Sequence, residues 1–340
     1  MPLSPSLSRD RLCELLARAR SQRVAVVGDA MLDVYLVGDV DRISPEAPVP
    51  VVRVRERRYA LGGAANVAQN VCALGATCLL VGAVGTDAGG STLRTMLGKM
   101  SVEADHLVEV ERPTTTKTRV VARSQQLVRV DEEDDADLAS GEIARLLDAV
   151  RAAIMTADAL VLEDYNKGVL VAEVIARAVG WARERGVPVV VDPKYRNFFA
   201  YRGATVFKPN RRELEAALGA AVNLDDAHAL PEVFARLGVE HLLLTLGERG
   251  MALLSHDGGV LRIPTMAREV YDVVGAGDTV TAYLGATLAA GAAAGEAAVI
   301  ANYAAGVEVG KLGAATVTPA EVLASYDDFV DRQAPSAERG

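Results

Sequence analysis

The prediction for this chain centres on one glycine-rich stretch, Val273-Val274-Gly275-Ala276-Gly277-Asp278-Thr279. It joins an apolar, strand-like run to a long helical run that begins at Asp278. At such a junction the backbone N–H groups of Gly275, Ala276 and Gly277 have no intrahelical acceptor and lie at the positive end of the helix dipole. Glycine permits close approach of a ligand to the backbone. The loop therefore predicts an anion site of phosphate size.

Asp278 adds a carboxylate at the same point of the chain. Transfer of a phosphoryl group needs hydrogen-bond donors for that group and a base for the attacking hydroxyl. Both would meet at this loop. The alternative is an ordinary strand-to-helix turn with an acidic residue at the helix start. These residues alone favour neither interpretation, so the rest of the chain has to decide.

Composition narrows the class of protein. The chain has 340 residues, 50% of them hydrophobic and 24% charged, with a net charge of −9 and an isoelectric point near 5.1. A net negative charge argues against nucleic acid as a partner, because the nucleic-acid backbone is also negatively charged. The three cysteines lack metal-ligand spacing, the first 22 residues are too charged for a signal peptide, and no run is a confident membrane span. We expect a cytoplasmic α/β protein without a membrane or nucleic-acid partner.

From residue 138 onward helix and strand patterns alternate. Helices are predicted over 138–155 and 171–185, and strands over 159–162 and 187–191. This alternation predicts a doubly wound, mostly parallel sheet with helices on both faces. Polar residues follow each strand, and because parallel strands end at one edge, they predict one extended site. These residues include Asp164, Lys194, Asn210, Glu213, Thr245, Gly247 and Gly250.

Polar residues near the amino terminus suit a polyol. Asp29 and Asp33 follow a strand predicted over 24–27, and carboxylates there can accept hydroxyl bonds from a sugar. Gly62, Gly63 and Asn66 open a helix that runs to about residue 74, where Asn66 offers both a donor and an acceptor. The alternatives are local capping or turn formation by the two aspartates and a tight loop with a helix-start asparagine.

Two excursions from the main sheet are predicted within a single domain spanning residues 1–340. The first, residues 34–58, contains strands over 34–40 and 49–55 without a crossover helix, which indicates an antiparallel pair that forms a β lid. The second covers residues 114–130. Exposed strand edges in the lid favour a homodimer in which two lids pair.

The second excursion carries a basic cluster. Lys117, Arg119 and Arg123 stand at odd positions and would share one face of a strand, with Gln125 just beyond. Guanidinium groups bind phosphate in a bidentate manner, so this face is a candidate for a sugar phosphate. A solvated strand face explains the pattern equally well. The acidic run over 132–135 is interpreted as a solvated connection.

Several motifs together resemble the ribokinase-like, or PfkB-type, carbohydrate kinases. They are Leu61-Gly62-Gly63-Ala64-Ala65-Asn66, Asp192-Pro193-Lys194, Pro209-Asn210-x-x-Glu213 and Gly275-Ala276-Gly277-Asp278. Three longer stretches are similar to the heptose 7-phosphate kinases of lipopolysaccharide-precursor synthesis within that family. These are residues 39–50, Asp164-Tyr165-x-Lys167-Gly168 and Gln125-Gln126-Leu127-x-Arg129-x-Asp131. Glu163, Asn166 and Val274 depart from the family pattern.

The resemblance implies a ribokinase-like fold with a β lid. It also implies ATP and Mg2+ as cofactors and phosphorylation of the anomeric hydroxyl of D-glycero-D-manno-heptose 7-phosphate. Asp278 would be the base, and residues 275–277 the anion hole. The nucleotide would lie against Lys194, Asn210, Glu213, Thr245, Gly247, Gly250 and Asn302, with Glu213 near the metal. Some relatives carry a second, nucleotidyltransferase domain, and we expect this chain to stop at the bisphosphate. A kinase of another sugar, or a sugar-binding protein without turnover, is the alternative.

Overall fold

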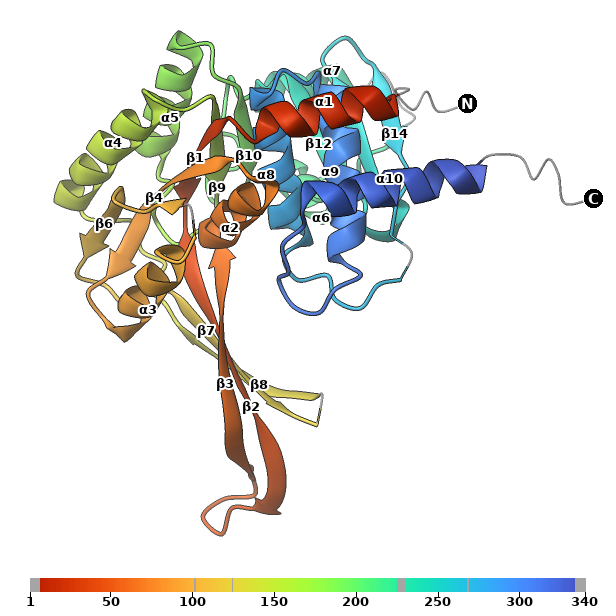
Figure 1. The fold of residues 1–340 in the computed structure, drawn as a ribbon. Helices are drawn as coiled ribbons and strands as arrows, with labels where there is room; N and C mark the ends of the chain where they lie inside the picture. Colours follow the sequence, from red (N-terminus) through yellow and green to blue (C-terminus); the bar gives the residue numbers. More distant parts are fainter. Residues whose placement is uncertain (1–6, 101, 124, 225–229, 268, 334–340) are drawn as a thin grey trace, which may run out of the picture.

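The computed structural model describes residues 7–100, 102–123, 125–224, 230–267 and 269–333 (Figure 1). Within them a 10-stranded sheet has the strand order β14-β13-β12-β11-β10-β9-β1-β4-β5, with β6 pairing with β4 off this path. A separate four-stranded sheet has the order β3-β2-β7-β8. The strands are β1 Arg23–Gly28, β2 Ala30–Ile43, β3 Pro50–Gly63, β4 Thr77–Gly85, β5 Val102–Glu103, β6 Leu107–Val110, β7 Thr116–Ala122, β8 Gln125–Glu132, β9 Ala159–Glu163, β10 Val189–Asp192, β11 Val206–Phe207, β12 His241–Thr245, β13 Met251–Ser255 and β14 Val260–Ile263.

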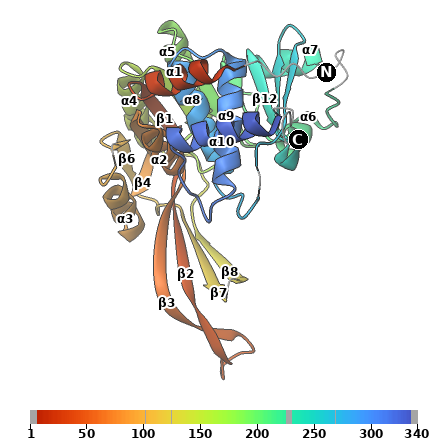
Figure 2. The same ribbon diagram turned by 45° about the vertical axis from the view of Figure 1, so that its right-hand side comes forward.

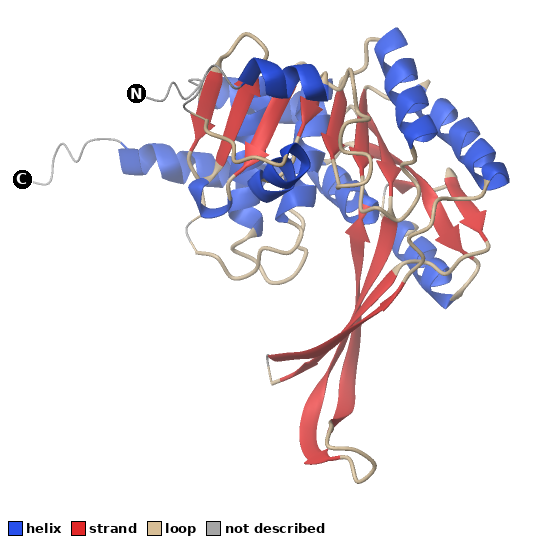
Figure 3. Ribbon diagram, turned by 180° about the vertical axis from the view of Figure 1, so that it is seen from behind, coloured by secondary structure: helices blue, strands red, loops and turns tan. Residues whose placement is uncertain are grey.

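Helices cover both faces of the main sheet (Figures 1 and 3). The helices are α1 Arg9–Ala19, α2 Ala64–Leu74, α3 Ala88–Leu97, α4 Ser140–Ile154, α5 Ala172–Glu184, α6 Arg211–Leu218, α7 Leu230–Leu237, α8 Ala276–Ala289, α9 Ala294–Glu308, α10 Pro319–Gln333 and the short 3-10 helix η1 Gly247–Arg249. Along β1, Val24 and Val26 pack into one core with α2, α8 and α9. Ala25 and Val27 pack into a second core with α4 and α5. This alternation confirms the predicted α/β class.

The topology places the site at the carboxyl end of β1. Strands β4, β1, β9, β10, β11 and β12 are parallel, while β13 and β14 are antiparallel additions at the edge. β4 pairs with one edge of β1, and β9, which comes later in the chain, pairs with the other edge. In open parallel sheets such a switch point leaves a crevice at the carboxyl ends of the strands, where ligands bind. The predicted polar rim lies at this edge.

The four-stranded sheet projects from the main body (Figure 2). β2 and β3 pair antiparallel from Ala30↔Gly63 to Ile43↔Pro50, so both strands are longer than predicted. Register shifts follow Val37 and Val40, and such bulges let long strands twist without losing their pairing. β7 pairs parallel with β2, and β8 pairs antiparallel with β7. The two predicted excursions thus form one sheet.

Two predictions about local structure are wrong. No strand precedes the glycine loop within the described part of residues 264–275. Instead the backbone amides of Tyr271 and Asp272 donate to the carbonyl of Val309 at the end of α9. These amides are therefore not paired with a neighbouring strand. The face proposed for three basic residues is also interrupted, because β7 ends at Ala122 and Arg123 lies in the turn with φ 48. No glycine or asparagine marks that turn in the sequence.

Among the described residues, no helix combines the length and the apolar composition that crossing a membrane requires.

Candidate active site

Helix α8 begins at the glycine loop, two residues before the predicted start. Gly275 is the residue before the helix and has φ 95, a conformation that favours glycine. No side chain caps this end of the helix. Gly277 and Asp278 therefore lie in the first turn, where backbone amides and the helix dipole favour an anion.

Asp278 is buried beside this helix start, with 5% of its surface exposed. The side-chain amide of Asn66 donates to Oδ2 at 2.7 Å, and the hydroxyl of Tyr165 donates to Oδ1 at 3.0 Å. Burial raises the pKa of Asp278 to about 6 and Asp192 adds to that effect, while the two hydrogen bonds oppose it. Such a carboxylate is ionised at neutral pH yet binds a proton more strongly than an exposed aspartate, which suits a general base.

Asn66 reaches Asp278 because α2 packs against α8. The preceding Gly63 has φ 54, and a Cβ there would lie 2.3 Å from the carbonyl oxygen of Asp29, so only glycine fits this approach. Asn70, one turn along α2, donates to the carbonyl and side-chain oxygens of Asn66 and accepts from the hydroxyl of Thr279. The glycine pair and the asparagine thus bring the two helix starts together.

Two lysines lie on the other side of the glycine loop. The ammonium of Lys208, 3% exposed, pairs with Asp192 at 2.7 Å and lies 3.6 Å from where a Cβ on Gly277 would stand. Burial lowers the pKa of Lys208, but the neighbouring carboxylates outweigh it and the net shift is upward, which keeps the group charged. Lys194 pairs with Glu213 at 2.7 Å. A buried positive charge therefore stands beside the predicted anion hole.

Three buried carboxylates converge at the ends of β9, β10 and the start of α8. One oxygen from each of Glu163, Asp192 and Asp278 lies within 4.8 Å of the others, a grouping of the kind that can hold a cation. Lys208 already neutralises Asp192, and two donors engage Asp278. Neither oxygen of Glu163 has a hydrogen-bond partner, and burial raises the pKa of this carboxyl well above its usual range. We assign no metal ion to the group.

Five of the seven residues predicted to bind nucleotide line one cavity of about 490 Å3, whereas Lys194 and Glu213 do not line it. Its walls combine the ends of β12 and β13 with α8 and α9. They include Asn210, Thr245, Gly247, Gly250, Gly277 and Asn302. Glu213 lies in the first turn of α6, where its carboxylate accepts the Asn210 amide in a capping box. The cavity thus opens onto the glycine loop at Gly277 and is lined mostly by apolar and backbone groups, as a purine site requires.

The structure gives two predicted substrate ligands, Asp29 and Asp164, partners within the protein. The carboxylate of Asp29 accepts backbone amides from Tyr165, Lys167 and Val169. That of Asp164 accepts the Tyr201 hydroxyl and the Asn166 amide. Burial raises the pKa of Asp29 to about 6. Both carboxylates hold the loop after β9 in place.

Two of the three basic residues predicted to form a cluster in the lid are already paired. Arg119 bonds to Asp33 at 2.5 Å, and Lys117 pairs with Glu133 at 2.9 Å. Lys167 joins Glu133 at 2.8 Å, so this part of the acidic run is an ion-pair partner and more than a solvated connection. A phosphate at this face would have to share these cations with their carboxylates.

The remaining lid residues lie in different surroundings. Arg123 is exposed in the turn, and Gln125 begins β8 and is exposed as well. Gly62 lies near the end of β3, where a Cβ would stand 3.0 Å from Oδ2 of Asp33 on the neighbouring β2. Both residues therefore lie in the four-stranded sheet, where Asp33 is paired with Arg119.

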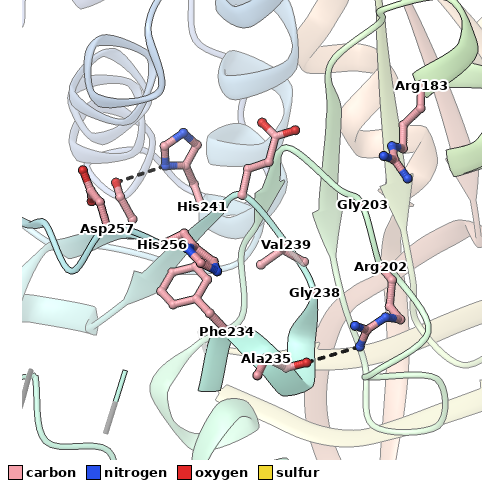
Figure 4. Close-up of a pocket in the computed structure, with 12 residues that line it drawn as sticks. Arg183, Arg202, Gly203, Phe234, Ala235, Gly238, Val239, His241, His256 and Asp257 are labelled. Carbon is pink, nitrogen blue, oxygen red and sulfur yellow. Dashed lines mark hydrogen bonds between the residues drawn. The ribbon is translucent and has the colours of Figure 1, made fainter. Parts of the chain in front are cut away.

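A cavity of about 850 Å3 lies at the opposite edge of the main sheet (Figure 4). It is found at the amino end of β12, with His241, His256, Phe234, Arg183 and Arg202 among its lining residues. His241 bonds to Ser255 at 3.1 Å, and Arg202 donates to the carbonyl of Ala235. None of the predicted site residues lines this cavity. The candidate active site is therefore at the carboxyl edge of the sheet.

The sequence assigned no individual role to four residues that the structure places at the centre, although Asp192, Lys208 and Tyr165 stand in the polar strand ends predicted to line one site. Asp192, Glu163, Lys208 and Tyr165 all follow or end strands of the parallel sheet. Their position at strand ends indicates a place in the site, because the carboxyl ends of adjacent parallel strands meet at the crevice. Nothing in the sequence distinguished Tyr165, whose hydroxyl reaches Asp278, from its polar neighbours.

Comparison with known proteins identifies the family. Residues 21–321 match the pfkB family of carbohydrate kinases. The chain belongs to this family. Its fold is ribokinase-like: ribokinase from Arabidopsis thaliana, solved with ribose and ATP, has a TM-score of 0.70 at 22% identity, covering 90% of this chain and 98% of that one. Phosphofructokinase-2 from Escherichia coli gives 0.74 at 19% identity, covering 91% and 99%.

Closer sequence relatives are bifunctional proteins named HldE. The chain is 48% identical to that of Rhodospirillum rubrum over 317 residues, which is 92% of this chain and 64% of the relative. It is 44% identical to that of Geobacter metallireducens over 323 residues, 94% of this chain and 66% of the relative. The chain thus spans about two thirds of the length of these relatives.

Proposed function

We propose that this carbohydrate kinase transfers the γ-phosphoryl group of ATP to the anomeric hydroxyl of D-glycero-D-manno-heptose 7-phosphate. The observation that carries the proposal is the buried Asp278 carboxylate at a glycine-capped helix start that opens onto the nucleotide cavity. The HldE relatives and the lid motifs support heptose 7-phosphate as the acceptor. A kinase that uses ATP from metabolism would act in the cytoplasm.

Asp278 would accept the proton of the attacking hydroxyl as the new bond to phosphorus forms. Amides of residues 275–277 and the Lys208 ammonium would neutralise the transferred group, since phosphoryl transfer depends mainly on alignment and charge stabilisation. The Lys208 ammonium lies 3.6 Å from where a Cβ on Gly277 would stand, so it is close to the anion hole. The bond from the hydroxyl oxygen to phosphorus forms while the bond from phosphorus to the β-phosphate oxygen breaks, and ADP leaves with that electron pair.

Mg2+ fits the carboxylate chemistry at this edge. Glu213 would hold the ion near the nucleotide phosphates, because its half-buried carboxylate accepts the amide of Asn210, a residue that lines the cavity, and oxygen ligands suit this cation. When bound, the ion would offset the charge of the nucleotide phosphates. Lys194 now occupies one Glu213 oxygen and would shift toward the phosphates.

The four-stranded sheet would act as a lid and as a dimer surface. Its outer strands β3 and β8 have unpaired edges, and Val54, Val128 and Val130 are exposed on it. Long exposed edges with apolar side chains favour pairing with another copy. We include a homodimer formed through this sheet in the proposal.

The test is phosphate transfer from ATP across heptose, hexose and pentose phosphates and their unphosphorylated counterparts. We expect heptose 7-phosphate to give the highest kcat/KM, with 31P NMR showing a new phosphate on the anomeric oxygen. Higher kcat/KM for another sugar would replace the substrate while keeping the kinase. No sugar-dependent ADP formation with any acceptor would favour a sugar-binding protein without turnover.

A further inference from the structure

The loop after β9 places a phenol against the proposed base. The Tyr165 hydroxyl donates to Oδ1 of Asp278 at 3.0 Å, while Asn66 engages Oδ2. The two donors come from different elements, the β9 loop and α2, so they hold the carboxylate from two sides. We propose that Tyr165 is a positioning residue that fixes the orientation of the Asp278 carboxylate and keeps it in its proton-accepting form. This inference rests on the proposed role of Asp278.

The backbone around Tyr165 is held rigidly. The Asp29 carboxylate, at the end of β1, accepts the amide of Tyr165 and two amides that follow it. The next residue, Asn166, has φ 54, and its side-chain oxygen accepts the amide of Arg196. These contacts explain why Asp29 and Asp164 are buried at the carboxyl edge of the sheet. Their carboxylates hold the loop that presents the Tyr165 phenol to Asp278.

The ring of Tyr165 is fixed as well. The ammonium of Lys194 lies 5.1 Å from its centroid, within the range of a cation–π contact. Cδ2 of the ring also lies 3.5 Å from the position of a Cβ on Gly63. Backbone and ring are thus both constrained, so the hydroxyl is set against Oδ1 before any substrate arrives. Such preorganisation avoids reorganisation during the reaction.

A hydrogen bond to a carboxylate favours its ionised form. Several groups face Asp278 from the surrounding elements and act on its proton affinity: Glu163 of β9, Asp192 of β10, Lys208 after β11, Glu308 of α9 and Tyr165. The nearby acidic groups and burial favour the protonated form of Asp278. Tyr165 and Asn66 oppose them directly. Burial also raises the pKa of the Tyr165 phenol, so the hydroxyl remains a donor across the working pH range.

The test compares Tyr165→Phe with Tyr283→Phe in the full chain. Tyr283 is also buried, lies on α8 itself and donates to the Val317 carbonyl, so its variant loses a buried hydroxyl bond without touching Asp278. For Tyr165→Phe we expect kcat at pH 7 to fall about ten- to thirtyfold, the effect of losing one charge-assisted bond. The acid limb of kcat/KM should move upward by about half a pH unit or more, and KM for ATP should stay within about twofold.

Two further variants make the result decisive. Site-specific 3-fluorotyrosine at position 165 keeps the ring and strengthens the donor, so the acid limb should move downward relative to wild type. Unchanged acid limbs in both Tyr165 variants, with kcat for Tyr165→Phe matching that of Tyr283→Phe, would overturn the inference. Asp278→Asn separates this outcome from failure of the proposed function: if that variant still turns over, the base assignment is wrong regardless of Tyr165.

Discussion

Glu308→Gln should stabilise the protein, and more so as the pH rises. Glu308 ends α9 with no exposed surface, and neither carboxylate oxygen makes a hydrogen bond of good geometry. Burial, with a smaller contribution from Asp272 and Asp278, raises its pKa from 4.5 to about 8, while the Ala315 amide and Lys311 oppose the shift. The unfolded chain releases this proton near pH 4.5 whereas the folded chain retains it to about pH 8. Stability is therefore lost progressively as pH rises through that window.

The size of the effect follows from the same values. Each pH unit between 4.5 and 8 removes up to about 1.4 kcal/mol from the free energy of unfolding. The ceiling is about 5 kcal/mol above pH 8, and relaxation of the surrounding groups should reduce it to about 2–4 kcal/mol. Glutamine keeps the shape of the side chain and removes the charge. The variant should match wild type at pH 4.5 and exceed it at pH 8.5.

The assay is urea unfolding of wild type and variant at several pH values between 4.5 and 9. Glu184→Gln is the matched control, since Glu184 lies exposed at the end of α5 and its replacement changes net charge equally. We expect the control to follow wild type within about 0.5 kcal/mol. A Glu308→Gln difference that is independent of pH, or a destabilised variant at pH 8.5, would refute the reasoning.

Three further predictions concern ligands and assembly. Arg119→Ala should weaken binding of heptose 7-phosphate about ten- to a hundredfold with ATP affinity unchanged; unchanged kinetics would leave Lys194 and Arg129 as the next candidates for the sugar phosphate. Glu213→Gln should raise the Mg2+ concentration needed for half-maximal activity about tenfold, because a charged oxygen ligand is lost; an unchanged Mg2+ titration would argue against this site. Sedimentation should show a homodimer at working concentrations, and a monomer throughout would remove the lid-pairing proposal.

The main sheet and the helix start at the glycine loop followed from the sequence. Alternating helix and strand patterns are strong over long windows, and Gly275 has a conformation that few other residues adopt. The convergence of the polar strand ends was predictable for the same reason: parallel strands end together. The sequence therefore placed Asp278 at this helix start before its surroundings were known.

Other details depend on contacts between distant parts of the chain. Asp29 has the position of a sugar ligand, but its three backbone partners lie about 140 residues away and leave no local signal. The ion pair of Asp33 with Arg119 likewise forms only when β2 and β7 lie side by side. The turn at Arg123 lacks the glycine or asparagine that would have marked it. Tertiary structure decides these roles.

The most direct test of the proposed mechanism is turnover of Asp278→Asn with ATP and heptose 7-phosphate. Asp148→Asn, an exposed change on α4, is the control for the altered charge. The amide keeps the shape of the side chain but cannot accept the hydroxyl proton. We expect kcat to fall at least about a hundredfold while the fold and ATP binding persist. Near-normal turnover by Asp278→Asn, measured as heptose-dependent ADP release, would contradict the assignment of Asp278 as the base.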